Sequence, residues 1–211
     1  MTRLMLKGTA ILALLFTATL GAMRAQPYDD GGLWAQLAPS GCPQPCFLGI
    51  RPGVTSADDA LALLRDNPWV AAITGRDDRK IIWTWNGEQP PFLHAEPEDS
   101  RLMLRDGIVH AIGLRTSAQM GDIKIVFGAP DMTYYLNWIM RDSTKNLFSY
   151  FELHGVYYDD QFEAAAASVC PLSMIAMWEL PVTLALPAST NRSDIFPVVR
   201  GAFAGVPKDC R

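Results

Sequence analysis

Three histidines, His94, His110 and His154, are the side chains best suited to proton transfer near neutral pH. They fall in separate segments, so the sequence does not gather them with other ligands into a metal site. The chain also has no G-x-S-x-G, H-E-x-x-H, phosphate-loop or dinucleotide-binding motif. Motifs whose spacing indicates a reaction mechanism are therefore absent from the sequence, and we expect no metal and no cofactor.

The catalytic arrangement that remains is a histidine paired with a carboxylate. The candidate pairs are His94 with Glu96 or Glu98, and His154 with Asp159 and Asp160. A general base must lie within hydrogen-bond reach of its substrate, and these spacings do not enforce that geometry. We therefore expect no catalytic residues, and an exported hydrolase that uses such a pair is the alternative.

The chain has four cysteines, Cys42, Cys46, Cys170 and Cys210. An even number favours two disulfides if the chain is exported, which residues 1–25 predict as described below, and three pairings are possible. The C-x-x-x-C spacing and the prolines of Cys-Pro-Gln-Pro-Cys argue against a C-x-x-C redox or zinc motif. We expect structural disulfides, and favour long-range bridges that tie the N-terminal cysteines to Cys170 and Cys210.

Aromatic residues recur with the period of a β-strand. Trp83 and Trp85 share one face of a predicted strand, and Tyr134 and Trp138 share one face of another. These rings either fill the core beneath the helices or form an exposed platform. Such a platform would bind a protein or a glycan, because Trp and Tyr offer large rigid contact surfaces.

Helices and antiparallel strands must position these residues. Thr55 or Ser56 predicts the N-cap of a helix that ends at Asn67-Pro68 and carries apolar residues on one face. Strands are predicted next, with Asp106-Gly107 as a hairpin turn and the acidic segment 88–100 as a loop. The predicted strands span residues 70–74, 80–85, 101–105 and 108–112.

A second helix is predicted after Thr116-Ser117, with Met120, Ile123, Val126 and Phe127 near one face. Further strands are predicted at 132–139, 147–153 and 156–159, with one or two more between 172 and 186. An offset of 62 residues places Leu61 on Ile123, Leu64 on Val126 and Pro68 on Pro130. We interpret this as two helix-plus-meander units, about 47–112 and 113–160, followed by a strand-rich tail, 161–211. The predicted fold class is α+β, an antiparallel sheet with short helices on one face.

Residues 1–25 have the layout of a secretory signal peptide. Basic Arg3 and Lys7 precede an apolar run from Thr9 to Ala22, with small residues before Gln26. The run is shorter than the roughly 20 residues of a spanning helix. We expect a secreted, periplasmic or cell-envelope protein with one α+β domain over 26–211 and no stable membrane span after cleavage. An uncleaved N-terminal anchor is the alternative.

The charge of the chain argues against nucleic acid as a partner. Without residues 1–25 it carries 15 basic and 22 acidic side chains, so the formal charge is 15 − 22 = −7. Nucleic-acid binding relies on clustered Lys and Arg, and here the basic residues are scattered.

The segment from Cys46 to Thr55, with its Pro-Gly-x-Thr turn before a helix, resembles exported bacterial proteins built from a helix and a β-meander. Its plan is similar to outer-membrane assembly lipoproteins of the SmpA/OmlA (BamE) type and to the β-lactamase inhibitor protein. The second unit resembles the same turn in Gly121-Asp122-Ile123, Gly128 and Pro130. The chain also looks like a group of uncharacterised secreted bacterial proteins. The resemblance implies an envelope location and a binding role, and brings no catalytic residues.

The sequence therefore predicts an exported, noncatalytic protein-interaction or envelope-associated module. Its candidate ligand-binding residues are Trp83, Trp85, Tyr134 and Trp138. The alternative is an exported hydrolase or carbohydrate-binding protein that uses the aromatic strands and a histidine-carboxylate pair.

Overall fold

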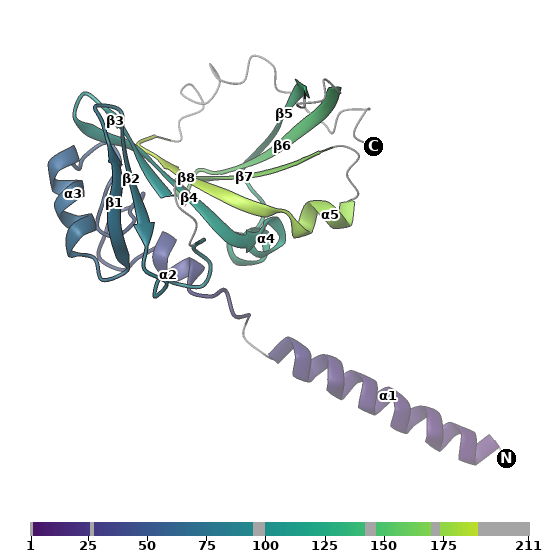
Figure 1. Ribbon diagram of the computed structural model, residues 1–211. Coiled ribbons are helices and arrows are strands. Elements are labelled where there is room, and N and C mark those ends of the chain that lie inside the picture. The colour runs from purple at the N-terminus through teal and green to yellow at the C-terminus, as the bar shows by residue number, and fades with distance from the viewer. Residues whose placement is uncertain (1, 26–27, 95–99, 142–146, 170–173, 190–211) are drawn as a thin grey trace. The chain divides into compact units, whose positions relative to one another are not determined.

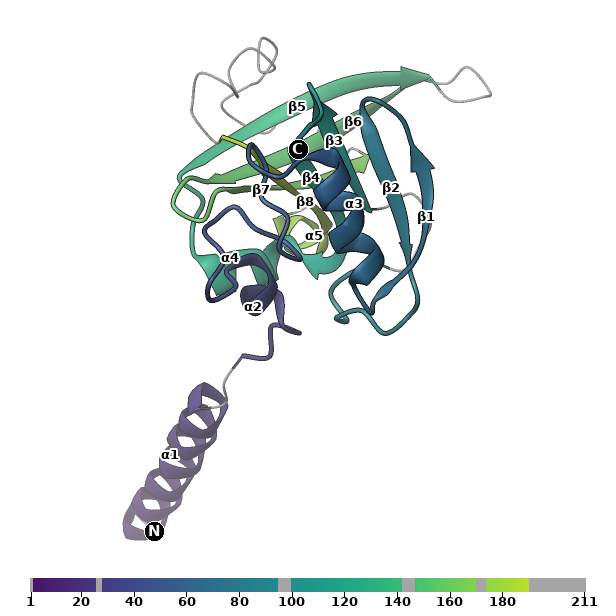
Figure 2. The same ribbon diagram turned by 90° about the vertical axis from the view of Figure 1, so that its left-hand side faces the viewer.

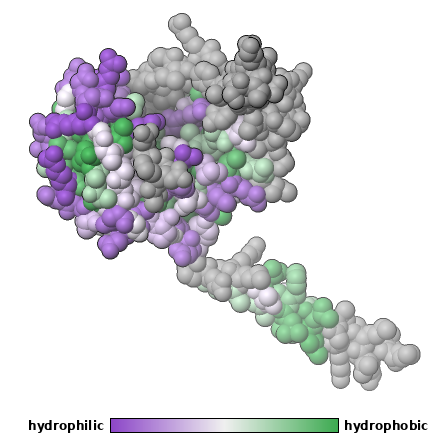
Figure 3. All heavy atoms as spheres, in the orientation of Figure 1, coloured by the Kyte–Doolittle hydropathy of each residue, from purple (hydrophilic) through white to green (hydrophobic). Residues whose placement is uncertain are grey.

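The computed structural model describes residues 2–25, 28–94, 100–141, 147–169 and 174–189. It divides into two compact units, Met1–Asp30 and Gly31–Arg211. The first contains one helix, α1 (Thr2–Ala25), which carries exposed apolar side chains such as Ile11 and Leu12 (Figure 3). None of the helices in the described ranges is both long enough and apolar enough to cross a membrane.

The second unit is built on an eight-stranded antiparallel sheet with the strand order β1-β2-β3-β4-β8-β7-β6-β5 (Figures 1 and 2). The strands are β1 (Val70–Arg76), β2 (Lys80–Trp85), β3 (Ser100–Arg105), β4 (Ile108–Gln119), β5 (Met132–Arg141), β6 (Leu147–Tyr157), β7 (Phe162–Val169) and β8 (Pro181–Pro187). The helices are α2 (Leu33–Leu37), α3 (Ala57–Asp66), α4 (Met120–Phe127) and α5 (Met174–Glu179). The α+β class and the antiparallel sheet predicted from the sequence are confirmed.

Each half of the sheet follows a helix. Strands β1 to β4 come after α3, β5 to β8 come after α4, and the halves join where β4 pairs with β8. That the halves are tandem copies stays a prediction. The predicted tail supplies β8, which lies at the centre of the sheet beside β4.

In the first half of the sheet, the helix cap and the hairpin turn lie where the sequence predicts them. The Ser56 hydroxyl accepts a hydrogen bond from the Asp59 backbone N–H and caps α3, which is followed by Asn67 as its C-cap. Asp106 and Gly107 have φ values of 53° and 75°, the left-handed pair that a two-residue hairpin requires. The hairpin joins β3 to β4 and fixes their register.

The start of the second helix was predicted wrongly. Thr116 and Ser117 belong to β4, and the N-cap of α4 is Gln119, whose backbone N–H donates to the Asp122 carboxylate. Strand β4 continues to Gln119 because it pairs with β8 over most of its length. That partner lies more than 60 residues ahead in the chain, so the local sequence did not reveal it.

Three elements of the second half also differ from the prediction. Strand β6 is continuous through Gly155, where a Cβ atom would lie 3.3 Å from the Pro130 side chain, so this glycine permits a close approach and makes no turn. Strand β7, rich in alanine, was not predicted. Part of the segment 172–186 is the helix α5 and only its end is the strand β8.

The core lies between one face of the sheet and helices α2, α3 and α4 (Figure 2). Strands contribute alternate residues to it, so β8 buries Val182, Leu184 and Leu186. Helix α3 adds Leu61 and Leu64. Burying an apolar side chain of this size stabilises the fold by about 1.5 to 3 kcal/mol.

The described disulfide joins Cys42 to Cys46, with a Cα–Cα distance of 6.0 Å. The favoured long-range bridges from these two cysteines are therefore wrong, because each sulfur already has its partner four residues away in the chain. The proline-rich loop brings the two Cα atoms within the distance that a disulfide needs. Cys170 and Cys210 lie outside the described residues.

Candidate functional site

The sheet face opposite the core, here called the open face, carries the candidate site. Side chains alternate along each strand, so residues paired across β4, β8, β7, β6 and β5 share this face. One row contains Arg115, Thr183, Ala165, His154 and Tyr134, which follow one another through the strand registers. No helix of the described ranges packs on this face (Figure 1).

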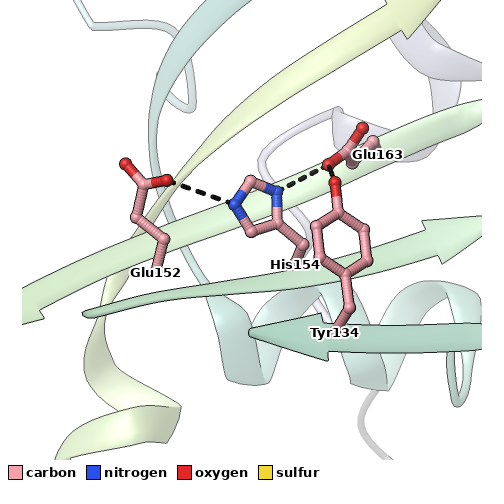
Figure 4. Close-up of polar contacts among 4 residues, drawn as sticks. All are labelled: Tyr134, Glu152, His154 and Glu163. Atoms are coloured by element: carbon pink, nitrogen blue, oxygen red, sulfur yellow. Dashed lines mark hydrogen bonds and ion pairs between the residues drawn. The ribbon is translucent and has the colours of Figure 1, made fainter. Parts of the chain in front are cut away.

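His154 is at the centre of a polar group formed by Tyr134, Glu152, His154 and Glu163, which we call the His154 cluster (Figure 4). Its Nδ1 atom lies 2.6 Å from Oε1 of Glu163, and the Tyr134 hydroxyl donates to the same oxygen. Tyr134 is paired with His154 across β5 and β6, and their rings stack with centroids 4.5 Å apart. One carboxylate therefore links three adjacent strands.

Glu152 completes the cluster from the other side of the ring. It precedes His154 by two residues on β6, which puts both side chains on the open face. Its Oε2 atom lies 3.3 Å from Nε2 of His154. The imidazole thus lies between two carboxylates, and the more exposed of the two is Glu152, at 29% against 18% for Glu163.

The cluster shifts the pKa of two of its members. Burial raises the pKa of Glu163, but hydrogen bonds from His154 and Tyr134 and the charge of His154 outweigh it, so the net pKa is lowered. Burial, together with the neighbouring Glu163 charge, raises the pKa of Tyr134 well above its usual value. At neutral pH, Glu163 is therefore an anion and Tyr134 a neutral donor.

The predicted histidine pairs are replaced by this arrangement. His154 lies within strand β6, and its carboxylate partners are Glu152 and Glu163. Asp159 and Asp160 follow the end of β6, and neither of these described residues forms a hydrogen bond or ion pair with His154. Glu96 and Glu98, the predicted partners of His94, lie outside the described residues.

The four aromatic residues of the predicted platform do not lie together in the structure. Trp83 and Trp85 are 0% and 6% exposed, and pack edge to face with each other and, for Trp85, with Phe47. They occupy the core, where no partner can reach them. Of the other two predicted rings, Tyr134 belongs to the His154 cluster, and Trp138 lies in β5 with its side chain outside the described ones.

No group of three His, Cys, Asp or Glu side chains in the described ranges is arranged to hold a metal ion. Within the His154 cluster the reason is visible in Figure 4, because the two carboxylates approach opposite edges of the imidazole. The three groups therefore do not converge on one point.

Comparisons with protein-family models, curated proteins and solved structures gave no match. The resemblance noted from the Pro-Gly-x-Thr turn therefore stays a prediction, and the site must be interpreted from its own geometry.

Sequence reasoning identified Tyr134 and His154 but missed Glu152 and Glu163. The spacing Glu152-x-His154 in a strand was a usable signal, since residues two apart share a face. Glu163 had no such signal, because its contact depends on the pairing of β6 with β7.

Proposed function

We propose that this protein is an exported, noncatalytic interaction module that binds a basic segment of a partner protein on its open face. The observation that carries the proposal is the pair of carboxylates held by His154. Each uses one oxygen in the cluster, and Oε1 of Glu152 and Oε2 of Glu163 make no recorded hydrogen bond to the described residues. Lys and Arg are the side chains that such free carboxylate oxygens bind.

The surroundings of the cluster support a macromolecular partner. Beside it the open face carries the small residues Ala165, Ala167 and Ala185, which are partly exposed. The acidity of the chain, −7 without residues 1–25, favours encounter with a basic partner. The resemblance to exported helix-plus-meander binding proteins points to the same class of function.

The hydrolase alternative draws support from the His154–Glu163 pair at 2.6 Å. In such a pair the nitrogen that does not face the carboxylate takes the proton of a nucleophile. Here that nitrogen, Nε2, lies 3.3 Å from the Glu152 carboxylate, and among the described residues no Ser, Thr or Cys side chain is hydrogen-bonded to it. The carbohydrate-binding alternative loses its platform with the burial of Trp83 and Trp85. Binding is therefore the function that the geometry favours.

A photocrosslinking amino acid at Thr183, which is exposed in the middle of the open face, tests the proposal in the native host. The control carries the same group at Leu63, 38% exposed on α3. We expect a discrete protein adduct from position 183 only, and its loss when Glu152→Lys is added. Equal adducts from both positions, or an adduct that survives the charge reversal, would contradict this function.

A further inference from the structure

The two hydrogen-bond contacts of His154 cannot both persist in the neutral ring. Imidazole donates from both nitrogens only when it is doubly protonated, and the neutral form has one donor and one acceptor. Both nitrogens face carboxylate oxygens, at 2.6 Å for Glu163 and 3.3 Å for Glu152. When the ring loses one proton, one nitrogen presents its lone pair to a carboxylate oxygen, and that contact becomes repulsive.

The geometry indicates which of the two carboxylate contacts is lost from the neutral His154 ring. Glu163 is nearer, more buried, and fixed by the Tyr134 hydroxyl on the same oxygen that accepts from Nδ1. Glu152 is farther away, more exposed, and has no other recorded partner among the described residues. The tautomer of a histidine follows the stronger hydrogen bond of its ring. The neutral ring therefore keeps its proton on Nδ1, and Nε2 loses its own.

Among the described residues that contact His154, no other charged group compensates for this change. The titratable groups that face His154 are Glu152 on its own strand, Glu163 from β7 and Tyr134 from β5. The residue paired with His154 on β7 is Ala165, which carries no charge. A protonated His154 is thus the cation that holds Glu152 to the sheet.

We propose that His154 is a proton-controlled latch that holds Glu152 in the cluster when the ring is doubly protonated and releases it when Nε2 loses its proton. The proton leaves to solvent, and the open face changes by one unit toward negative charge. The consequence for binding rests on the function proposed above: a basic segment binds more tightly at the upper end of the range between about pH 5 and 8, in which histidines commonly titrate.

The protonation state of the two His154 ring nitrogens can be measured directly. The test is a ¹⁵N NMR pH titration of the full chain, which has only three histidines, with His154→Gln to assign the signals. We expect two protonated nitrogens at pH 5 and the Nδ1–H tautomer at pH 8. An Nε2–H tautomer at pH 8, or a His154 ring that does not change between these values, would overturn the proposal.

Two variants test whether Glu163 sets the tautomer of His154. Glu163→Gln weakens the bond that fixes Nδ1–H, so we expect the Nε2–H tautomer to gain population at pH 8. The matched control is Glu88→Gln on an exposed loop residue, which should leave the His154 signals unchanged. An unchanged tautomer in Glu163→Gln would show that Glu163 does not set it, and would count against the latch.

Binding is measured separately with a synthetic tetralysine peptide. Several-fold tighter binding at pH 8 than at pH 6, lost in His154→Gln, is the expected result. If the tautomer changes as expected and tetralysine does not bind, the latch stands and the proposed function fails. If tetralysine binds equally at both values and the His154 ring does not titrate, the latch fails and the function stands.

Discussion

Replacing Glu163 by Gln is the sharpest test of the His154 cluster. The change keeps the shape of the side chain and one carbonyl oxygen, but removes the charge that accepts from Tyr134 and His154. Hydrogen bonds to a charged group contribute about 1.5 to 3 kcal/mol and neutral ones about 1 kcal/mol. Because both donors share one oxygen, their contributions do not add fully. We therefore expect Glu163→Gln to lower the free energy of unfolding by about 1 to 2 kcal/mol at pH 7.

The pH dependence of this loss follows from the lowered pKa of Glu163. In the unfolded chain the carboxyl has its ordinary pKa of 4.5, so as pH falls the unfolded state takes up the proton first. The stabilisation by the ionised group is complete above that value and is lost as pH falls through the folded-state pKa. The wild type and the variant should therefore converge in stability at low pH.

Urea unfolding of both chains at pH 7.0, 5.5 and 3.5 measures the difference, and the Glu88→Gln variant is the control for a general loss of acidic charge. A variant as stable as the wild type at pH 7 would refute the reasoning. So would a deficit of equal size at pH 7 and pH 3.5, since it would show that the charge of Glu163 is not its source.

Three further predictions concern the stability of the fold. Ser100→Ala removes the acceptor of the buried Trp85 indole N–H, 2.9 Å away, and should cost about 1 to 3 kcal/mol in urea unfolding; no change would mean that the indole has another partner. Gly121→Ala should lower the melting temperature despite the better helix propensity of alanine, because a Cβ would lie 2.7 Å from the Trp178 ring and 3.1 Å from its carbonyl oxygen. Replacing both cysteines of the Cys42–Cys46 bond by Ala should cost about 2 kcal/mol, measured against the oxidised wild type, since the loop it closes is short; a loss above about 4 kcal/mol would point to a packing role instead.

The parts of the fold that local sequence specifies were predictable. The Ser56 cap, the Asp106-Gly107 hairpin and the strand Lys80–Trp85 each depend on residues that are close together in the chain. Capping groups and left-handed turns act over a few residues, so their signals remain in the sequence whatever the rest of the chain does.

The elements that were missed depend on distant partners. Strand β7 contains the run Ala164 to Ala167, and alanine has low intrinsic preference for strands, yet the run pairs on both sides with β6 and β8. The full length of β4 likewise depends on β8. The candidate site shows the same division, because Glu152 could be inferred from its own strand and Glu163 could not.

The position of the cluster within the sheet bears on what it can do. Among the described strands β5 is an edge strand, and it pairs with β6. The Tyr134–Glu163 and His154–Glu163 bonds tie this edge to β7 by side chains, in addition to the backbone ladder. These bonds hold Glu163 in one position on the open face, which would reduce the ordering cost of binding the basic segment proposed above. Both ring nitrogens of His154 face carboxylates, and in the neutral form proposed above Nε2 becomes an acceptor while Nδ1 keeps its bond to Glu163.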